Sequence, residues 1–262
     1  MEFSFNNRTV FIGTDNQQLD ASRETVVFIH GAGQNHSIWV LPTRYFARKK
    51  FNVLSVDLPG HGKSAGPCLS TIEEMSDWMV GLLDALGLQK FAIVGHSMGS
   101  LVALAVAAEH AERTRSLAMV GTSVPMPVSD ALLESAKAND HAALEMLTYW
   151  GHSTPAHFGN NPNPGMWTLG GGMRLLEQAD DGVVYADLNA CSQYQVGIEH
   201  AAAVQCPAML ILGESDMMTP VRATKDLAAA LSNVETVVLP QAGHALLSER
   251  PNCVLDALIR IV

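Results

Sequence analysis

Short apolar runs alternate along this chain with longer stretches in which apolar residues recur every three to four positions. Runs that are apolar throughout predict strands buried on both faces, and the longer stretches predict helices with one buried face. The predicted strands are residues 3–5, 10–12, 25–29, 52–56, 91–94, 116–120, 208–212 and 235–239. The predicted core helices are residues 39–49, 71–86, 101–108, 221–231 and 252–262.

Strands that alternate with helices predict an α/β fold with a mostly parallel, doubly wound sheet of about eight strands. Residues 122–206 break this alternation, because they contain four helix-like pieces (129–138, 142–150, 173–179 and 185–193) and no convincing strand. A stretch of about 85 residues is long for a single crossover. We therefore expect a helical cap at 122–206, inserted into a core made of 1–121 and 207–262; the alternative is a set of ordinary crossover helices.

Composition and charge narrow the classes of partner. The 262 residues include 16 Lys and Arg against 26 Asp and Glu, so the net charge is −10. This charge disfavours nucleic acids and anionic membranes, which attract basic surfaces. We expect a cytoplasmic protein, because no secretory signal or membrane span is evident and the cysteines are scattered. We also expect a monomer or a homodimer. The cysteine positions also lack the spacing of a metal site.

The first chemical motif is Gly95-His96-Ser97-Met98-Gly99, which lies between a predicted strand and a predicted helix. G-x-S-x-G in that context predicts a nucleophile elbow, in which a strained turn presents the serine hydroxyl at the edge of the sheet. Because a serine hydroxyl is a poor nucleophile at neutral pH, it needs a base and a carboxylate that orients the base. The motif alone also occurs by chance, so the remaining groups must be found.

A base and an acid follow later strands. His244 comes after the last predicted strand, and Asp216 lies a few residues past the strand before it. The resulting chain order of serine, acid and histidine is the one that this architecture requires. Glu214 is the alternative acid, although its side chain leaves the strand earlier. Catalytic residues are therefore predicted to be Ser97, Asp216 and His244.

Oxyanion stabilisation requires backbone N–H groups that are free to donate. His30-Gly31-Ala32-Gly33 follows the third predicted strand and has small side chains near its N–H groups. We expect an oxyanion hole formed by the N–H groups of Met98 and Ala32, with Gly33 as the alternative to Ala32.

These motifs together resemble the α/β-hydrolase superfamily, and the resemblance covers nearly the whole chain apart from the cap. The stretch Asp57-Leu58-Pro59-Gly60-His61-Gly62-Lys63-Ser64 is a further mark of that family. It implies a tight turn near the site, in which we expect structural roles for Asp57 and His61. The resemblance leaves esterases, lactonases, thioesterases, carbon–carbon bond hydrolases, small peptidases, cofactor-free oxidants and receptors with intact triads. Serine at position 97 excludes the relatives that use aspartate there.

The cap is acidic and rich in methionine and tryptophan. Lys137 and Arg174 stand against nine acids, so residues 122–206 carry a charge of −7. Such a surface disfavours polyanionic substrates, and thioether and aromatic side chains suit an apolar pocket. The glycine run 170–172 is a candidate hinge for the cap. The candidate pocket residues are Gly31, Gly33, Met126, Trp150, Trp167 and Met217.

The sequence therefore predicts a carboxylesterase-like serine hydrolase that acts through an acyl-enzyme on small or medium, mostly neutral apolar esters. We expect no metal and no organic cofactor. Carbon–carbon bond hydrolysis or lactone hydrolysis remains the alternative within enzymes. The alternative of another class is a small-molecule receptor that keeps the triad but turns over very slowly and docks a partner through its cap.

Overall fold

A computed structural model describes residues 1–160, 162 and 165–262; of the polar loop around residue 160, positions 161, 163 and 164 lie outside it. Eight strands form one sheet in the order β1-β2-β4-β3-β5-β6-β7-β8. β1 and β2 form an antiparallel hairpin, β2 pairs antiparallel with β4, and all other pairs are parallel. The strands are β1 Glu2–Phe5, β2 Arg8–Gly13, β3 Thr25–Ile29, β4 Asn52–Val56, β5 Phe91–His96, β6 Thr114–Val120, β7 Ala208–Gly213 and β8 Val234–Leu239. The predicted fold class is confirmed.

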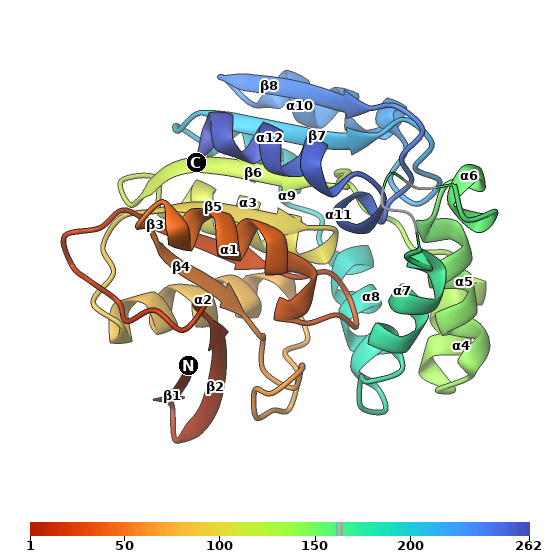
Figure 1. The fold of residues 1–262 in the computed structure, drawn as a ribbon, viewed down its shortest axis with the longest axis horizontal. Helices are drawn as coiled ribbons and strands as arrows, with labels where there is room; N and C mark the ends of the chain where they lie inside the picture. Colours follow the sequence, from red (N-terminus) through yellow and green to blue (C-terminus); the bar gives the residue numbers. More distant parts are fainter. Residues whose placement is uncertain (161, 163–164) are drawn as a thin grey trace.

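Helices cover both faces of the sheet (Figure 1). The short 3₁₀ helix η1 (His36–Trp39), α1 (Val40–Arg48) and α12 (Pro251–Ile261) pack on one face, where Phe28 and Trp39 lie fully buried. On the other face lie α2 (Ile72–Ala85), α3 (Met98–Glu109) and α10 (Lys225–Ala230). The central strands β3, β4 and β5 are buried along their whole length, as expected for runs that are apolar throughout.

The cap helices, a name used here for α4 to α8, lie beyond the carboxyl ends of the parallel strands (Figure 1). They have a small apolar core of their own, which includes Leu132, Leu147 and Leu188. Two of these helices, α4 and α5, have side-chain N-caps. Ser129 and Asp140 accept hydrogen bonds from N–H groups in the first turns of these helices. The cap helices are α4 Asp130–Lys137, α5 His141–Gly151, α6 Thr154–His157, α7 Thr168–Leu176 and α8 Val183–Gln193.

Several elements differ from the sequence expectation. The predicted helix 221–231 is divided into the 3₁₀ turn η2 (Val221–Thr224) and α10. Three short helices, α6, α9 (Gly197–Ala203) and α11 (Leu246–Glu249), were not predicted. α9 packs on α3 of the core rather than within the cap. α7 begins five residues before the predicted piece 173–179, so the glycine run 170–172 lies inside a helix rather than in a loop. No helix among the described residues is long and apolar enough to cross a bilayer.

Candidate active site

Ser97 lies at the sharp turn between β5 and α3, with a φ of 51° and a ψ of −121°. A residue other than glycine rarely adopts such a positive φ, so the backbone of this turn is strained at the serine. The flanking glycines explain how this turn is built. A Cβ at position 95 would lie 1.9 Å from the carbonyl oxygen of Gly99, and one at position 99 would lie 2.4 Å from that of His30. Strand and helix can therefore pass this closely only if both positions are glycine.

His244 and Asp216 meet beside this turn, although they follow different strands. The Nδ1–H of His244 donates to Oδ2 of Asp216 at 2.8 Å. Nε2 of His244 is buried and has no hydrogen-bond partner among the described residues, so its lone pair remains available as a base. His244 and Ser97 line the same cavity. The structure thus pairs His244 with Asp216 and places His244 on the same cavity as Ser97.

Asp216 is held as a carboxylate by four donors. Its Oδ1 accepts from the N–H groups of Met218 and Thr219, and its Oδ2 accepts from the Thr219 hydroxyl as well as from His244. Burial alone would raise the pKa of Asp216, but the charge of His244 and these hydrogen bonds outweigh it and lower the pKa to about 2. Glu214, the alternative acid, is exposed and accepts a hydrogen bond from the N–H of Gln241 instead.

In the loop after β3, the N–H groups of Gly31 and Gly33 are occupied, and that of Gly31 donates to Oε1 of Gln34 at 3.2 Å. The N–H of Gly33 donates to Oδ2 of Asp187, at 2.8 Å. Within the described part of the chain, the N–H groups of Ala32 and Met98 meet no acceptor. Of the two alternatives in this loop, Ala32 is therefore the one with a donor available for an oxyanion.

A cavity of about 790 Å³ lies between the core and the cap helices, with Ser97 and His244 in its wall. Its surface is mainly apolar. Five of the six predicted pocket residues line it: Gly31, Met126, Trp150, Trp167 and Met217. The sixth, Gly33, lies outside the lining, because Val184 and Leu176 of the cap helices pack over it and its N–H points to Asp187.

Comparison with known proteins places the fold and the chemistry in context. Residues 26–257 match the family model described as the alpha/beta hydrolase family. The chain belongs to this family. It is 26% identical over 255 residues to a putative carbamate hydrolase, RutD, of Caulobacter sp. (strain K31), a match that covers 92% of this chain and 91% of that protein. It is 24% identical to the (E)-2-((N-methylformamido)methylene)succinate hydrolase of Acinetobacter baylyi, over 90% of this chain and 89% of that protein.

Among solved structures, the enol-lactonase of Burkholderia xenovorans LB400 superposes with a TM-score of 0.86 at 22% identity, covering 99% of this chain and 98% of that one. Such a likeness shows a shared fold. The family match and the names of the curated relatives establish a hydrolase of the α/β-hydrolase family. The names of the relatives and of the structural neighbour differ in the bond that is cleaved.

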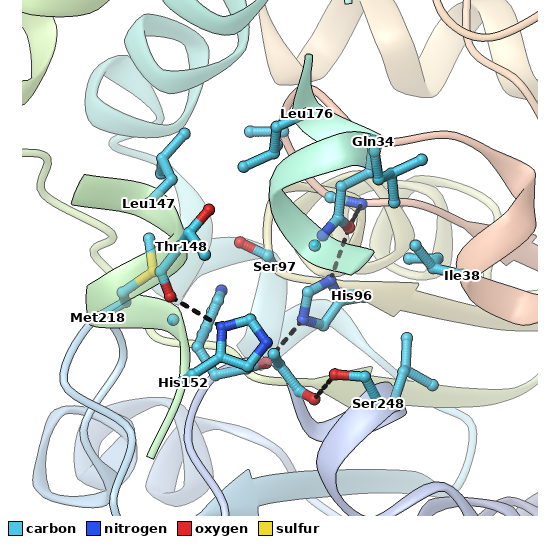
Figure 2. Close-up of a pocket in the computed structure, with 18 of the residues that line it drawn as sticks. Gln34, Ile38, His96, Ser97, Leu147, Thr148, His152, Leu176, Met218 and Ser248 are labelled. Atoms are coloured by element: carbon cyan, nitrogen blue, oxygen red, sulfur yellow. Dashed lines mark hydrogen bonds between the residues drawn. The ribbon is translucent and has the colours of Figure 1, made fainter. Parts of the chain in front are cut away.

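Two polar side chains of this α/β hydrolase were not anticipated from the sequence. Nδ1 of His96 lies 3.2 Å from Oε1 of Gln34 (Figure 2), and its Nε2 lies 3.0 Å from the carbonyl oxygen of His244. Burial is the main reason that the pKa of His96 falls to about 3, so its ring is neutral and the Nε2–H donates to His244. His96 thereby supports the loop that carries His244. Its position inside the elbow motif was the only available signal.

A second support of the His244 loop comes from Glu249, which is buried directly beyond it. Its carboxylate accepts from the N–H of Gly243, at 3.0 Å, and from the N–H and hydroxyl of Ser153 at the start of α6. The same carboxylate therefore touches both the loop that carries His244 and the cap helices. No local sequence pattern predicts this contact, since Ser153 and Glu249 are 96 positions apart.

Asp57 has the structural role expected for this part of the hydrolase. Its carboxylate accepts from the N–H and Nδ1 of His36 and from the N–H of Lys63, so it holds the tight turn after β4 together. Arg174 is the one arginine of the predicted cap, and its side chain is 79% exposed in an ion pair with Glu177. Although it borders the cavity, its charge is directed to solvent and to that partner.

Proposed function

We propose that this α/β hydrolase cleaves carboxylic esters through an acyl-enzyme on Ser97. The observation that carries the proposal is that Ser97 and His244 line the same apolar cavity, while Asp216 holds His244 from outside it. Ser97 sits on the strained elbow, Nε2 of His244 is unpartnered, and Asp216 holds the opposite ring nitrogen. An ester that places its carbonyl carbon against Ser97 would find a nucleophile, a base and an orienting acid already arranged.

The proposed reaction has two steps. Oγ of Ser97 bonds to the carbonyl carbon while its proton passes to Nε2 of His244, and the N–H groups of Ala32 and Met98 receive the developing oxyanion. The carbon–oxygen bond to the alcohol then breaks, and the alcohol leaves with the proton from His244. Water repeats the sequence on the acyl-enzyme and releases the acid. Asp216 remains a carboxylate throughout, in keeping with its lowered pKa.

The cavity favours a neutral, mostly apolar substrate. A volume of about 790 Å³ accommodates a small or medium ester, and its mainly apolar wall offers few groups to solvate a charge. Arg174, the residue that would suit a carboxylate-bearing substrate, is paired with Glu177 and exposed. Lactones remain within the proposal, because a lactone is a cyclic ester and its ring opens by the same attack.

The test is the hydrolysis of p-nitrophenyl esters from acetate to laurate, with Ser97→Ala as the control. We expect turnover above about 1 s⁻¹ on the preferred chain length. We expect a rise and then a fall in kcat/KM along the series, because a cavity of fixed size fits some acyl groups better than others. Ser97→Ala should lose nearly all turnover and keep the wild-type melting temperature. Butyrolactone and a phenyl carbamate extend the panel to the bonds named in the relatives.

Each result has a defined meaning. An active Ser97→Ala enzyme would overturn the assignment of the nucleophile. Equal rates along the ester series would remove the argument from pocket size. Faster cleavage of the lactone or the carbamate would assign the enzyme to that substrate class instead of acyclic esters. Turnover orders of magnitude below about 1 s⁻¹ on every substrate would favour a receptor.

A further inference from the structure

A buried ion pair joins the cap helices to the loop that carries Ala32. Asp187 lies in α8 and is fully buried, and its Oδ2 is 2.8 Å from Nε2 of His61. His61 follows β4 on the core, and its Nδ1 lies 3.0 Å from the carbonyl oxygen of Pro59. Because both ring nitrogens face oxygen acceptors, the ring can satisfy both contacts only as the imidazolium.

The environment of His61 favours that charge. Burial would lower the pKa of His61, but the Asp187 carboxylate, the Pro59 carbonyl and Asp57 outweigh it and raise the pKa. The neighbouring His30 ring, 4.8 Å away between centroids, is neutral, because burial lowers its pKa to about 4. Its Nδ1–H donates to the carbonyl oxygen of Gly31, while its Nε2 accepts from the N–H of Leu58. The positive charge of this cluster is therefore on His61.

The same carboxylate oxygen of Asp187 also accepts the N–H of Gly33, at 2.8 Å. This bond sets the plane of the peptide unit between Ala32 and Gly33. Ala32 lies directly before it, and its own N–H is the free donor of the loop. The Ala32 N–H belongs to the preceding peptide unit, which shares the Cα of Ala32 with it. A displacement of the Ala32–Gly33 peptide would therefore also move the Ala32 N–H, so the contact with α8 restrains how that donor is presented.

The charge of the Asp187 carboxylate also affects the oxyanion of the proposed reaction. A lone carboxylate hydrogen-bonded one residue from the oxyanion donor would repel the negative charge that develops in the transition state. The imidazolium of His61 cancels that repulsion while leaving the hydrogen bond to Gly33 in place. Neither His61 nor Asp187 lines the cavity, so neither touches the substrate.

We propose that Asp187 and His61 are positioning residues for the oxyanion loop: the Asp187 carboxylate orients the Ala32–Gly33 peptide, and His61 neutralises that carboxylate. This inference rests on the proposed function, since it assigns a task to the Ala32 N–H. On this inference, acylation is fast only when α8 is packed against the loop that carries Ala32. It also gives His61 of the Asp57–Ser64 stretch a role beyond the turn.

The test compares Asp187→Asn, Asp187→Ala, His61→Gln and the double variant His61→Gln/Asp187→Asn. The control is Asp181→Asn, which makes the same change at an exposed position of the cap region. The probe is diethyl p-nitrophenyl phosphate: Ser97 Oγ bonds to phosphorus, p-nitrophenolate leaves, and His244 takes the serine proton. The release of p-nitrophenolate therefore reports the reactivity of Ser97 towards an oxyanion-forming electrophile, and kcat and KM on the preferred ester are measured beside it.

We expect His61→Gln to slow both reactions by about 10- to 100-fold with little change in KM, because the glutamine amide still donates but leaves the carboxylate charged. The double variant should recover part of that loss, because the asparagine carries no charge. Asp187→Ala should slow the reactions and speed hydrogen exchange at residues 31–34, whereas Asp181→Asn should match wild type in all measurements.

Folded variants that react at the wild-type rate would overturn the inference. A double variant that is slower than His61→Gln would overturn its electrostatic part. If the wild type reacts neither with the phosphate nor with any ester, the proposed function fails. Hydrogen exchange at residues 31–34 then decides the positioning claim, which is overturned if Asp187→Ala exchanges like Asp181→Asn.

Discussion

At the scale of single residues, the site depends on which polar atoms are satisfied and which are left free. Asp216 accepts four hydrogen bonds, and the N–H of Gly33 donates to Asp187. Nε2 of His244 and the N–H of Ala32, by contrast, have no partner among the described residues. The atoms that the proposed reaction needs are thus the ones that the fold leaves unpaired, while their neighbours are held in place.

Asp216→Asn should lower kcat by roughly 10⁴-fold and leave the protein folded, because an amide cannot stabilise the imidazolium and favours the wrong tautomer of His244. Glu214→Gln is the matched control and should keep wild-type kcat, since Glu214 is exposed and contacts the Gln241 N–H. Steady-state kinetics on one p-nitrophenyl ester measures both. A loss in Glu214→Gln comparable to that in Asp216→Asn would contradict the assignment of the acid.

The pKa of Asp216 also predicts how stability changes with pH. Its folded value of about 2 lies below the ordinary 3.8, so the ionised carboxylate stabilises the folded state above about pH 4. That contribution is lost as the pH falls through 2. The difference in the free energy of unfolding between wild type and Asp216→Asn should therefore shrink as urea unfolding is repeated from pH 6 down to pH 2.

At the scale of elements, the elbow shows how a short motif sets the geometry of a strand and a helix. Gly95 and Gly99 let β5, α3 and β3 approach one another more closely than any side chain permits. By contrast, Gly171 of α7 has open space around its Cβ position, so glycine is not required there by packing. The same residue type is therefore essential at position 99 and replaceable at position 171.

Gly99→Ala should destabilise the protein by more than about 3 kcal/mol, or prevent folding, because the new Cβ would meet backbone atoms that have no room to move. Gly171→Ala should be neutral or stabilising by up to about 1 kcal/mol, since alanine favours a helix over glycine. Urea unfolding compares the two. If Gly171→Ala were more stable and yet slower in turnover, position 171, which lines the cavity, would contribute to activity independently of stability.

At the scale of the whole molecule, the cap helices do more than cover the cavity. Asp187 joins them to the oxyanion loop, and Glu249 joins them to the loop of His244. Their region also carries a charge of −7, although Asp187 is buried and neutralised by His61. The acidic exterior and the apolar interior both act against charged acyl groups.

The p-nitrophenyl monoester of glutarate should be hydrolysed with a kcat/KM at least about tenfold below that of p-nitrophenyl valerate, which has the same chain length without the carboxylate. The acidic surface repels the anion and the apolar cavity does not solvate it, so added salt should narrow the gap by screening the first effect. Arg174→Gln is the control and should leave the ratio unchanged, because that side chain is exposed and paired with Glu177. A selective loss on the glutarate ester would instead place Arg174 in the substrate site.

The sequence by itself determined the features that depend on neighbours along the chain. Apolar runs predicted the core strands to within two residues at each end, because burial between two helix layers requires apolar side chains at successive positions. The elbow could be predicted for the same local reason. The order of Ser97, Asp216 and His244 followed from the rule that loops at the carboxyl ends of parallel strands converge.

Only the tertiary structure decided which distant groups are paired. Gly33 and Asp187 are 154 positions apart, and His61 and Asp187 are 126 apart, so no local periodicity brings them together. Because Gly33 donates to Asp187, the free N–H of the loop is that of Ala32. The same contacts keep Gly33 out of the cavity lining and bury Asp187, which the sequence alone suggests is a surface acid. The packing of the cap on the core produces all three results, because a buried polar group must find its partner wherever the fold places one.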